Sequence, residues 1–310
     1  MRAALLALAT LLLLLTGCGS PAADDAPIGE RQVRVTTTTN FLTDTVARIG
    51  GDRVAVTGLM GPGVDPHLYR ASADDVRALR DADVVLYGGL HLEGKMAELF
   101  EQLGERQRVT AVTDDIPREQ LLVPPGGVAG EHDPHVWFDV TLWQQVSRTI
   151  ATTLAEVDPQ HAAAYRANLA TYLTELDALD TYVSERIATL PADRRLLVTS
   201  HDAFAYFGRR YGMEVAGIQG VSTAAEATTA DVERVAALLV TRRLPAVFVE
   251  SSVPRQTVDA LVAAAARQGL TVQVGQELYT DAAGSPGTPE GTYVGTLRAN
   301  TDRIVTALNG

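Results

Sequence analysis

Residues 158–190 read DPQHAAAYRANLATYLTELDALDTYVSERIATL, the longest periodic stretch in the chain. Asp158 and Pro159 suit the N-cap and the first helical position, and no Gly or Pro follows before Pro191. Apolar side chains recur at three- and four-residue spacing: Tyr165, Leu169, Tyr172, Leu176, Leu179, Val183, Ile187 and Leu190. The pattern predicts one continuous helix of about 32 residues, roughly 48 Å long. Because that length exceeds one small lobe, we interpret the helix as a rigid brace that spans two lobes.

Short apolar segments alternate with helical patterns on both sides of this helix. We predict strands at 33–37, 54–56, 83–87, 108–112, 135–140, 196–199, 214–216, 246–249 and 271–274. The predicted helices are one capped by Asn40, one opened by a capping box at Ser72, those at 93–103, 142–157, 203–211, 231–241 and 254–267, and a last one from near Thr292. This alternation predicts parallel sheets covered by helices.

The fold class is therefore α/β, with two lobes that each contain a mostly parallel sheet flanked by helices. We place the N-terminal lobe at 33–157, the long linker helix at 158–191 and the C-terminal lobe at 192–310. The length of 310 residues also favours two domains.

The N-terminus has the pattern of a bacterial lipoprotein signal. Arg2 precedes an apolar run at 3–15, which is shorter than the roughly 20 residues of a membrane-spanning helix. Leu15-Thr16-Gly17-Cys18 then resembles a lipobox, in which cleavage precedes a cysteine that is lipidated. We predict a signal peptide at 1–17, and a lipidated Cys18 followed by a flexible tether at 18–32, which would anchor the protein outside the cytoplasm.

Composition excludes several classes of function. The chain has 26 Lys and Arg against 38 Asp and Glu, a net charge of −12, which argues against nucleic-acid binding and would suit a cationic ligand. Cys18 is the only cysteine, so an intrachain disulfide framework and a cysteine-based zinc finger are both excluded.

Three of the six histidines stand where a ligand is expected. His67 and His135 each end an Asp-Pro-His triplet, and His201 follows the predicted strand at 196–199. Open α/β sheets bind ligands at the carboxyl ends of their strands, and a preceding proline presents a histidine from a stiff turn. Since imidazole is the commonest metal ligand in proteins, the three histidines predict a metal site.

The remaining histidines are weaker candidates. His161 lies in the first turn of the long helix, where a structural or solvated role is expected. His91 lies at a strand end, and His132 lies in a Pro/Gly-rich loop at 124–131 and its continuation. Either could assist the site without forming its core.

A four-ligand zinc site without cysteine needs a carboxylate as its fourth ligand. Asp281 lies in a Gly/Ala-rich loop after the last predicted strand and is one candidate. Glu250 and Asp202 are others, and the residues alone do not select among the three.

An ordered set of motifs spans nearly the whole mature chain. It comprises Val64-Asp65-Pro66-His67, Gly89-Leu90-His91-Leu92-Glu93, Asp133-Pro134-His135-Val136-Trp137-Phe138-Asp139, Ser200-His201-Asp202-Ala203-Phe204, Ile218-Gln219-Gly220-Val221-Ser222-Thr223 and Glu250-Ser251-Ser252-Val253-Pro254. This set resembles the zinc/manganese-binding lipoproteins of ABC importers, the TroA-like solute-binding proteins. The resemblance implies two α/β lobes joined by a long helix, with the metal between them.

The resemblance also implies the ligands and the partners. His67 and His135 would come from the first lobe, and His201 and Asp281 from the second. One Zn²⁺, or else Mn²⁺, would be bound per chain as transported cargo. The partners would be the membrane permease of an ABC importer and its ATPase, and the protein would be a monomer anchored to the cell membrane, without nucleic acid and without enzymatic activity.

His201 bears on the choice of metal. Members of the family assigned to manganese often have Glu at this position, whereas His is typical of zinc binders and of some that take both metals. Three imidazoles and one carboxylate also suit zinc better than manganese. Many zinc binders, however, have a long His-rich loop where this chain has only 126–133.

Two other functions fit parts of the pattern. A three-histidine zinc site with bound water would be hydrolytic, but a fourth protein ligand closes the coordination sphere, and neither Gly-x-Ser-x-Gly nor His-Glu-x-x-His occurs. A solute-binding protein for a metal chelate or siderophore would share the long helix, but its histidines would not converge.

The helix and the ligand loops together predict how metal is released. A helix without internal Gly or Pro resists bending, so a large hinge closure is not expected. We expect instead local movement around His201 and in the Gly/Ala-rich loop of Asp281, or a small tilt of the second lobe.

Overall fold

The computed structural model describes residues 26–125, 127 and 130–309, so the predicted signal peptide and Cys18 lie outside the described residues. Within those ranges, every helix is too short or too polar to cross a bilayer. The prediction of an α/β fold with parallel sheets flanked by helices and one long helix is confirmed. The lobe boundaries by residue number stay a prediction.

The first lobe is built on a four-stranded parallel sheet. Its strands are β1 (Val33–Thr37), β2 (Val54–Gly58), β3 (Val84–Tyr87) and β4 (Arg108–Ala111), in the order β2-β1-β3-β4. The chain reverses its direction of sheet growth between β1 and β3, and ligands of such sheets bind beyond the carboxyl ends of the strands.

Helices cover both faces of this sheet. On one face Val85 packs in a cluster with Leu79 of α2 (Ala73–Asp81) and Phe100 of α3 (Ala97–Gly104), a helix preceded by a 3₁₀ turn at Gly94–Met96. On the other face Val84 and Leu86 pack with α1 (Asn40–Gly50) and α4 (Val140–Val157). Burial on both faces explains why the central strand β3 is continuously apolar.

The second lobe contains two short parallel pairs. Strand β5 (Leu196–His201) pairs with β6 (Glu214–Gln219), and β7 (Ala246–Val247) pairs with β8 (Gln273–Val274). A backbone hydrogen bond of 3.0 Å from Phe248 to Val198 joins the two pairs. The helices of this lobe are α6 (Ala205–Tyr211), α7 (Thr229–Arg242) and α8 (Gln256–Arg267).

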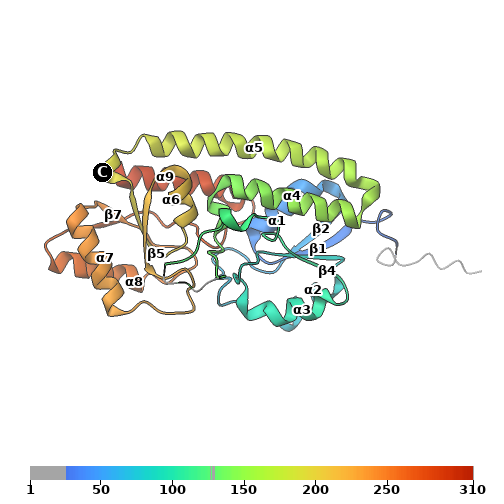
Figure 1. Cartoon of the computed structure of the whole chain (residues 1–310), viewed down its shortest axis with the longest axis horizontal. Helices are drawn as coiled ribbons and strands as arrows, with labels where there is room; N and C mark the ends of the chain where they lie inside the picture. Colours follow the sequence, from blue (N-terminus) through green and yellow to red (C-terminus); the bar gives the residue numbers. More distant parts are fainter. Residues whose placement is uncertain (1–25, 126, 128–129, 310) are drawn as a thin grey trace, which may run out of the picture.

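The long helix joins the two lobes along one side. Helix α5 (Ala162–Ala188) packs against α1 and α4 of the first lobe and against the last helix, α9 (Tyr293–Asn309). Figure 1 shows α5 running over both lobes, with α4 and α1 beneath one end and α9 beneath the other. Most of the predicted apolar stripe is buried: Tyr165, Tyr172, Leu176, Leu179, Val183 and Ile187.

The ends of the long helix differ from the prediction. The chain forms a 3₁₀ turn at Pro159–His161 before α5 begins, and the α-helix ends at Ala188 instead of continuing to Leu190. Asp158 makes no side-chain cap to the backbone, because its buried carboxylate accepts hydrogen bonds from Tyr165 Oη at 2.8 Å and from the His161 ring at 2.9 Å. His161 is therefore structural, as the sequence analysis expected.

Two local predictions were wrong. The segment predicted as a strand at 135–140 forms a 3₁₀ turn at Val136–Phe138, which leads into α4 through an N-cap at Asp139. The N-cap of α1 is Thr39, whose hydroxyl accepts from the backbone N–H of Leu42, and not Asn40. The Asn40 side chain bonds to the second lobe instead, so a tertiary contact takes the place of the local cap.

Candidate metal centre

Four side chains converge between the two lobes. His67 lies in the loop after β2 and His135 directly before the 3₁₀ turn at Val136–Phe138, both in the first lobe. His201 is the last residue of β5, and Asp281 lies in the loop after β8, both in the second lobe. One nitrogen or oxygen of each side chain lies within 4.8 Å of those of the other three, and all four residues are buried.

The spacing of these atoms suits a single small ion. His135 Nε2 lies 3.3 Å from Nε2 of His67 and 3.3 Å from Nε2 of His201. Asp281 Oδ1 lies 3.4 Å from His135 Nε2 and 3.6 Å from His201 Nε2. A tetrahedron with metal–ligand bonds of about 2.0–2.1 Å has edges of about 3.3 Å. The four measured separations therefore lie close to the edges of such a tetrahedron.

Carboxylates fix the orientation of two of the rings. Asp133 Oδ1 lies 2.7 Å from His135 Nδ1 and accepts the backbone N–H of the same residue at 2.9 Å. Glu250 pairs with His201 in the same way, through Nδ1 and through the backbone N–H at 2.9 Å. Each carboxylate holds the proton on Nδ1, so the neutral ring presents the lone pair of Nε2 to the centre of the cluster.

Asp281 offers one oxygen to the same centre. Its Oδ2 accepts a hydrogen bond of 2.8 Å from Ser252, whereas its Oδ1 is buried and has no hydrogen-bond partner among the described residues. An orphaned buried carboxylate oxygen is costly unless a cation or a donor satisfies it. With Oδ2 occupied by Ser252, the residue is set to bind an ion through Oδ1 alone.

The pKa values show how the cluster balances its charge without metal. Burial lowers the pKa of His67 to about 3. Burial also acts to lower the pKa of His135, but Asp133 and Asp281 outweigh it and raise that pKa to about 9. Burial opposes the charge on Asp281 as well, yet His201 and His135 hold its pKa well below the usual value. The metal-free cluster thus keeps Asp281 ionised beside protonated imidazole.

The Asp281 loop is pinned by the first lobe. The Trp137 indole donates to the carbonyl of Thr280 at 2.9 Å. Asn40 donates to the carbonyl of Ala283 at 3.0 Å and accepts its N–H at 2.8 Å. Thr280, Asp281 and Ala283 are all buried, so the loop that the sequence analysis expected to be pliable is held in place on both sides of its carboxylate.

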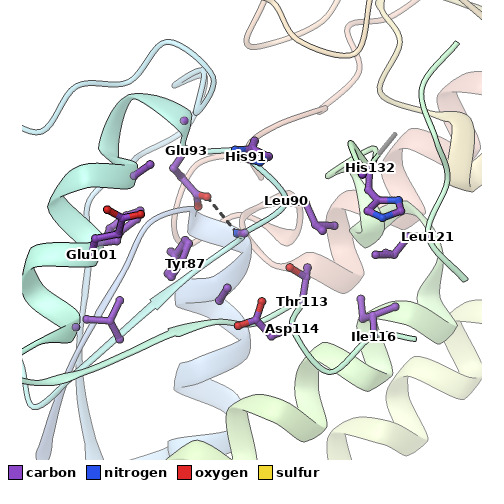
Figure 2. A pocket seen from close by; sticks show the side chains of 18 of the residues that line it. Tyr87, Leu90, His91, Glu93, Glu101, Thr113, Asp114, Ile116, Leu121 and His132 are labelled. Carbon is purple, nitrogen blue, oxygen red and sulfur yellow. Dashed lines mark hydrogen bonds between the residues drawn. The ribbon is translucent and has the colours of Figure 1, made fainter. Parts of the chain in front are cut away.

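The other candidates lie outside the cluster. His91 and His132 line a separate pocket of about 480 Å³ beyond the carboxyl ends of β3 and β4 (Figure 2). Figure 2 shows their rings on opposite sides of that pocket, with Leu90 between them. Glu250 acts on His201 and not at the centre, and Asp202 is not one of the four converging residues.

The residues that support the cluster are less evident in the sequence than the four that converge. Asp133 was visible only as the first residue of a triplet, and Ser252 only as part of the Glu250-Ser251-Ser252 motif. In both triplets the Asp accepts the backbone N–H of the His two residues later, at 2.8 Å for His67 and 2.9 Å for His135. Asp-Pro-His is thus a local turn that presents histidine, and the repeat of this triplet was the available signal.

Known proteins are similar to this chain over most of its length. A family model described as "Zinc-uptake complex component A periplasmic" matches residues 35–307. The chain is 46% identical over 294 residues to the manganese-binding lipoprotein MntA of Bacillus subtilis (strain 168), covering 95% of each chain. It is 47% identical over 292 residues to the zinc-binding protein TroA of Treponema pallidum (strain Nichols), covering 94% of this chain and 92% of that one.

A solved structure agrees with these relatives. The periplasmic zinc-binding protein TroA from Treponema pallidum matches with a TM-score of 0.86 at 47% identity, over 89% of this chain and 99% of that one. These relatives are named for metal binding and not for a reaction, which confirms the prediction that the chain is not an enzyme. The resemblance noted in the sequence is likewise confirmed: the chain belongs to the zinc-uptake complex component A family, as a TroA-type solute-binding protein.

Proposed function

We propose that this protein is an extracytoplasmic, lipid-anchored receptor that captures one divalent transition-metal ion between its lobes and delivers it to an ABC importer. The observation that carries the proposal is the buried convergence of three Nε2 atoms on an orphaned carboxylate oxygen. The proposed ligands are His67, His135, His201 and Asp281. The partners are the permease and ATPase of the importer, and Cys18 bears the lipid.

We further propose zinc as the favoured ion, with manganese next. Three imidazoles and one carboxylate form a nitrogen-rich set, whereas manganese prefers more oxygen ligands. Ser252 occupies Oδ2 of Asp281, so the carboxylate adds one oxygen and the set stays at four ligands. Four ligands at the separations measured here match the tetrahedral preference of zinc. One relative is named for manganese and the other for zinc, so their names do not choose between the metals. The argument for zinc is the set of donor atoms.

The alternatives explain the site less well. A zinc hydrolase keeps an open position for water, whereas four side chains converge here. A receptor for a chelate or siderophore needs a wide pocket, whereas His135 Nε2 lies only 3.3 Å from the nitrogens of both other rings.

Metal analysis of the purified protein, followed by loading with Co²⁺, tests this proposal. We expect about one divalent ion per chain and the intense visible absorption of tetrahedral Co²⁺, which Zn²⁺ should displace and Mn²⁺ should displace only in large excess. A weak, octahedral-type spectrum with preferential displacement by Mn²⁺ would overturn the choice of zinc. Absence of any stoichiometric divalent ion would overturn the receptor function itself.

A further inference from the structure

The motif at residues 218–223 contributes no side chain to the four that converge in the metal centre. The segment Ile218-Gln219-Gly220-Val221-Ser222-Thr223 leaves the end of β6, the neighbour of the strand that presents His201. Its last residue, Thr223, contacts the first lobe. The Thr223 hydroxyl donates a hydrogen bond of 2.6 Å to Oδ2 of Asp65. The other oxygen of Asp65 accepts the backbone N–H of His67 at 2.8 Å. A continuous chain of contacts therefore runs from the second lobe to a proposed ligand of the first.

These contacts lie at the outer rim of the cluster. His67 is 5% exposed, whereas His135 and His201 are fully buried, and Leu68 directly after it is 50% exposed. The loop also approaches the second lobe closely at Gly63, where a Cβ would lie 3.2 Å from the Ser251 carbonyl and φ is +71°. Only glycine suits that position, so the sequence itself allows the two lobes to meet at this rim.

His67 is supported differently from the other ligands. The rings of His135 and His201 are each held by a carboxylate, and Asp281 is held by Ser252. Among the described residues, the His67 ring hydrogen-bonds only to the ring of His135. Its support is on the backbone, through Asp65, and the second oxygen of Asp65 is held by a residue of the opposite lobe.

We propose that the Thr223–Asp65 hydrogen bond is a latch that positions His67 through Asp65, and that its opening sets the rate at which the ion leaves the site. This inference rests on the proposed function and adds that a residue of the second lobe controls the position of a proposed ligand of the first lobe. The reason is that, among the described residues, the His67 ring is held by no carboxylate, unlike the rings of His135 and His201, so its position depends on the support of its backbone by Asp65. Thr223 and Asp65 are positioning residues and do not contact the ion.

The test compares Thr223→Val, which keeps the shape and removes the hydroxyl, with Thr223→Ser, which keeps the hydroxyl. The zinc-loaded full chain is mixed with excess chelator and the dissociation rate is followed by stopped flow. We expect Thr223→Val to release zinc about tenfold to a hundredfold faster, as for loss of a hydrogen bond to a charged group. Thr223→Ser and the neighbouring Ser222→Ala, whose hydroxyl serves its own turn, should release zinc at the wild-type rate.

A double-mutant cycle separates positioning from a general structural role. If Thr223 acts through Asp65, Thr223→Val should add nothing to the rate in an Asp65→Ala background. A merely structural role would lower the melting temperature of the metal-free protein and leave the dissociation rate unchanged. The latch would be overturned if Thr223→Val released zinc at the wild-type rate. It would also be overturned if the effects of Thr223→Val and Asp65→Ala on that rate were fully additive. A wild-type chain that binds no divalent ion would instead refute the proposed function.

Discussion

The proton positions on two histidines decide what the cluster can bind. Asp133 and Glu250 hold the Nδ1 protons of His135 and His201, so their neutral rings direct lone pairs at each other across 3.3 Å. Two lone pairs at that distance repel unless a proton or a cation lies between them. The cluster is therefore built for a positive charge at its centre, and a metal ion competes there with protons.

Removing one proposed ligand should impair binding far more than removing a distant histidine. His67→Ala leaves three of the four proposed ligands, which cannot complete a tetrahedral shell without water, so affinity should fall by orders of magnitude. His161→Ala is the control, because that ring bonds to Asp158 at the start of the long helix. Competition against a chelator of known affinity measures both, and an unchanged affinity in His67→Ala would remove the residue from the site.

The carboxylate behind His201 should matter although it does not contact the ion. Glu250→Gln weakens the charge-assisted support of Nδ1 and permits the wrong tautomer, so zinc affinity should fall about 10–100-fold. Glu277→Gln, an exposed glutamate after β8, is the matched control. Equal affinities for the two variants, measured by calorimetric titration, would show that the Glu250 contact has no effect on binding.

Metal binding should release protons at neutral pH. The pKa of His135 is raised to about 9 and that of His201 well above its usual value, so both rings bind protons at pH 7 when the metal is absent. The ion needs them neutral, so affinity should rise as pH increases toward 9 and fall as pH decreases. His67 should contribute nothing in this range, since its pKa is lowered to about 3.

Calorimetry in buffers of different ionisation enthalpy counts the released protons. We expect at least one proton per ion at pH 7. An affinity that is independent of pH between 7 and 9 would contradict the raised pKa values. The predicted window lies above that of free imidazole, because neighbouring carboxylates stabilise the charged rings.

At the scale of elements, one short loop is held in place although its composition predicts a flexible segment. The loop around Asp281 is rich in Gly and Ala, yet Trp137 and Asn40 of the first lobe bond to its backbone at Thr280 and Ala283. Helix α5, by contrast, follows its apolar spacing and packs against helices of both lobes. For the loop, contacts made across the fold, and not local residue types, thus decide that it is held.

The Asn40 contact should be measurable as stability. Asn40→Ala leaves the N–H and carbonyl of buried Ala283 without partners, which should reduce the free energy of unfolding by about 1–3 kcal/mol. Asn309→Ala, at the exposed end of α9, should change it little. Urea unfolding of the metal-free proteins gives both values, and indistinguishable midpoints would mean that the loop is not pinned by Asn40.

At the scale of the whole molecule, the geometry favours a small local opening. Helix α5 contains no Gly or Pro over its 27 residues and packs on both lobes, so bending it must break backbone hydrogen bonds. Because Trp137 and Asn40 pin the Asp281 loop, we expect the opening at the rim, where Thr223 bonds to Asp65. The sequence alone predicts movement around His201 and Asp281, or a small tilt of the second lobe, and these stay alternatives that the next measurement distinguishes.

Solution scattering and hydrogen exchange test the size and place of that opening. We expect nearly equal radii of gyration with and without zinc, and exchange that changes at 59–68 and 220–228 but little at 279–283. A change of several ångströms in the radius would contradict the rigid brace. Exchange that changes mainly at 279–283 would restore the pliable-loop interpretation.

The sequence by itself determined the features that depend on short-range order. The apolar spacing of residues 165–187 is a property of one helix, and the continuously apolar strand β3 identifies a sheet buried on both faces. The Asp-Pro-His triplets form local turns whose hydrogen bonds span two residues, so His67 and His135 were identifiable without the fold. His201 followed from its place at a strand end.

Only the tertiary structure decided which carboxylate joins the histidines. Asp281, Glu250 and Asp202 were equal candidates by sequence, because a carboxylate's role depends on which ring nitrogen it faces. The fold turns Glu250 toward Nδ1 of His201 and places Asp281 within reach of Nε2. The contacts of Asn40 with Ala283 and of Thr223 with Asp65 join residues far apart in the chain, and no local pattern encodes a distance across the two lobes.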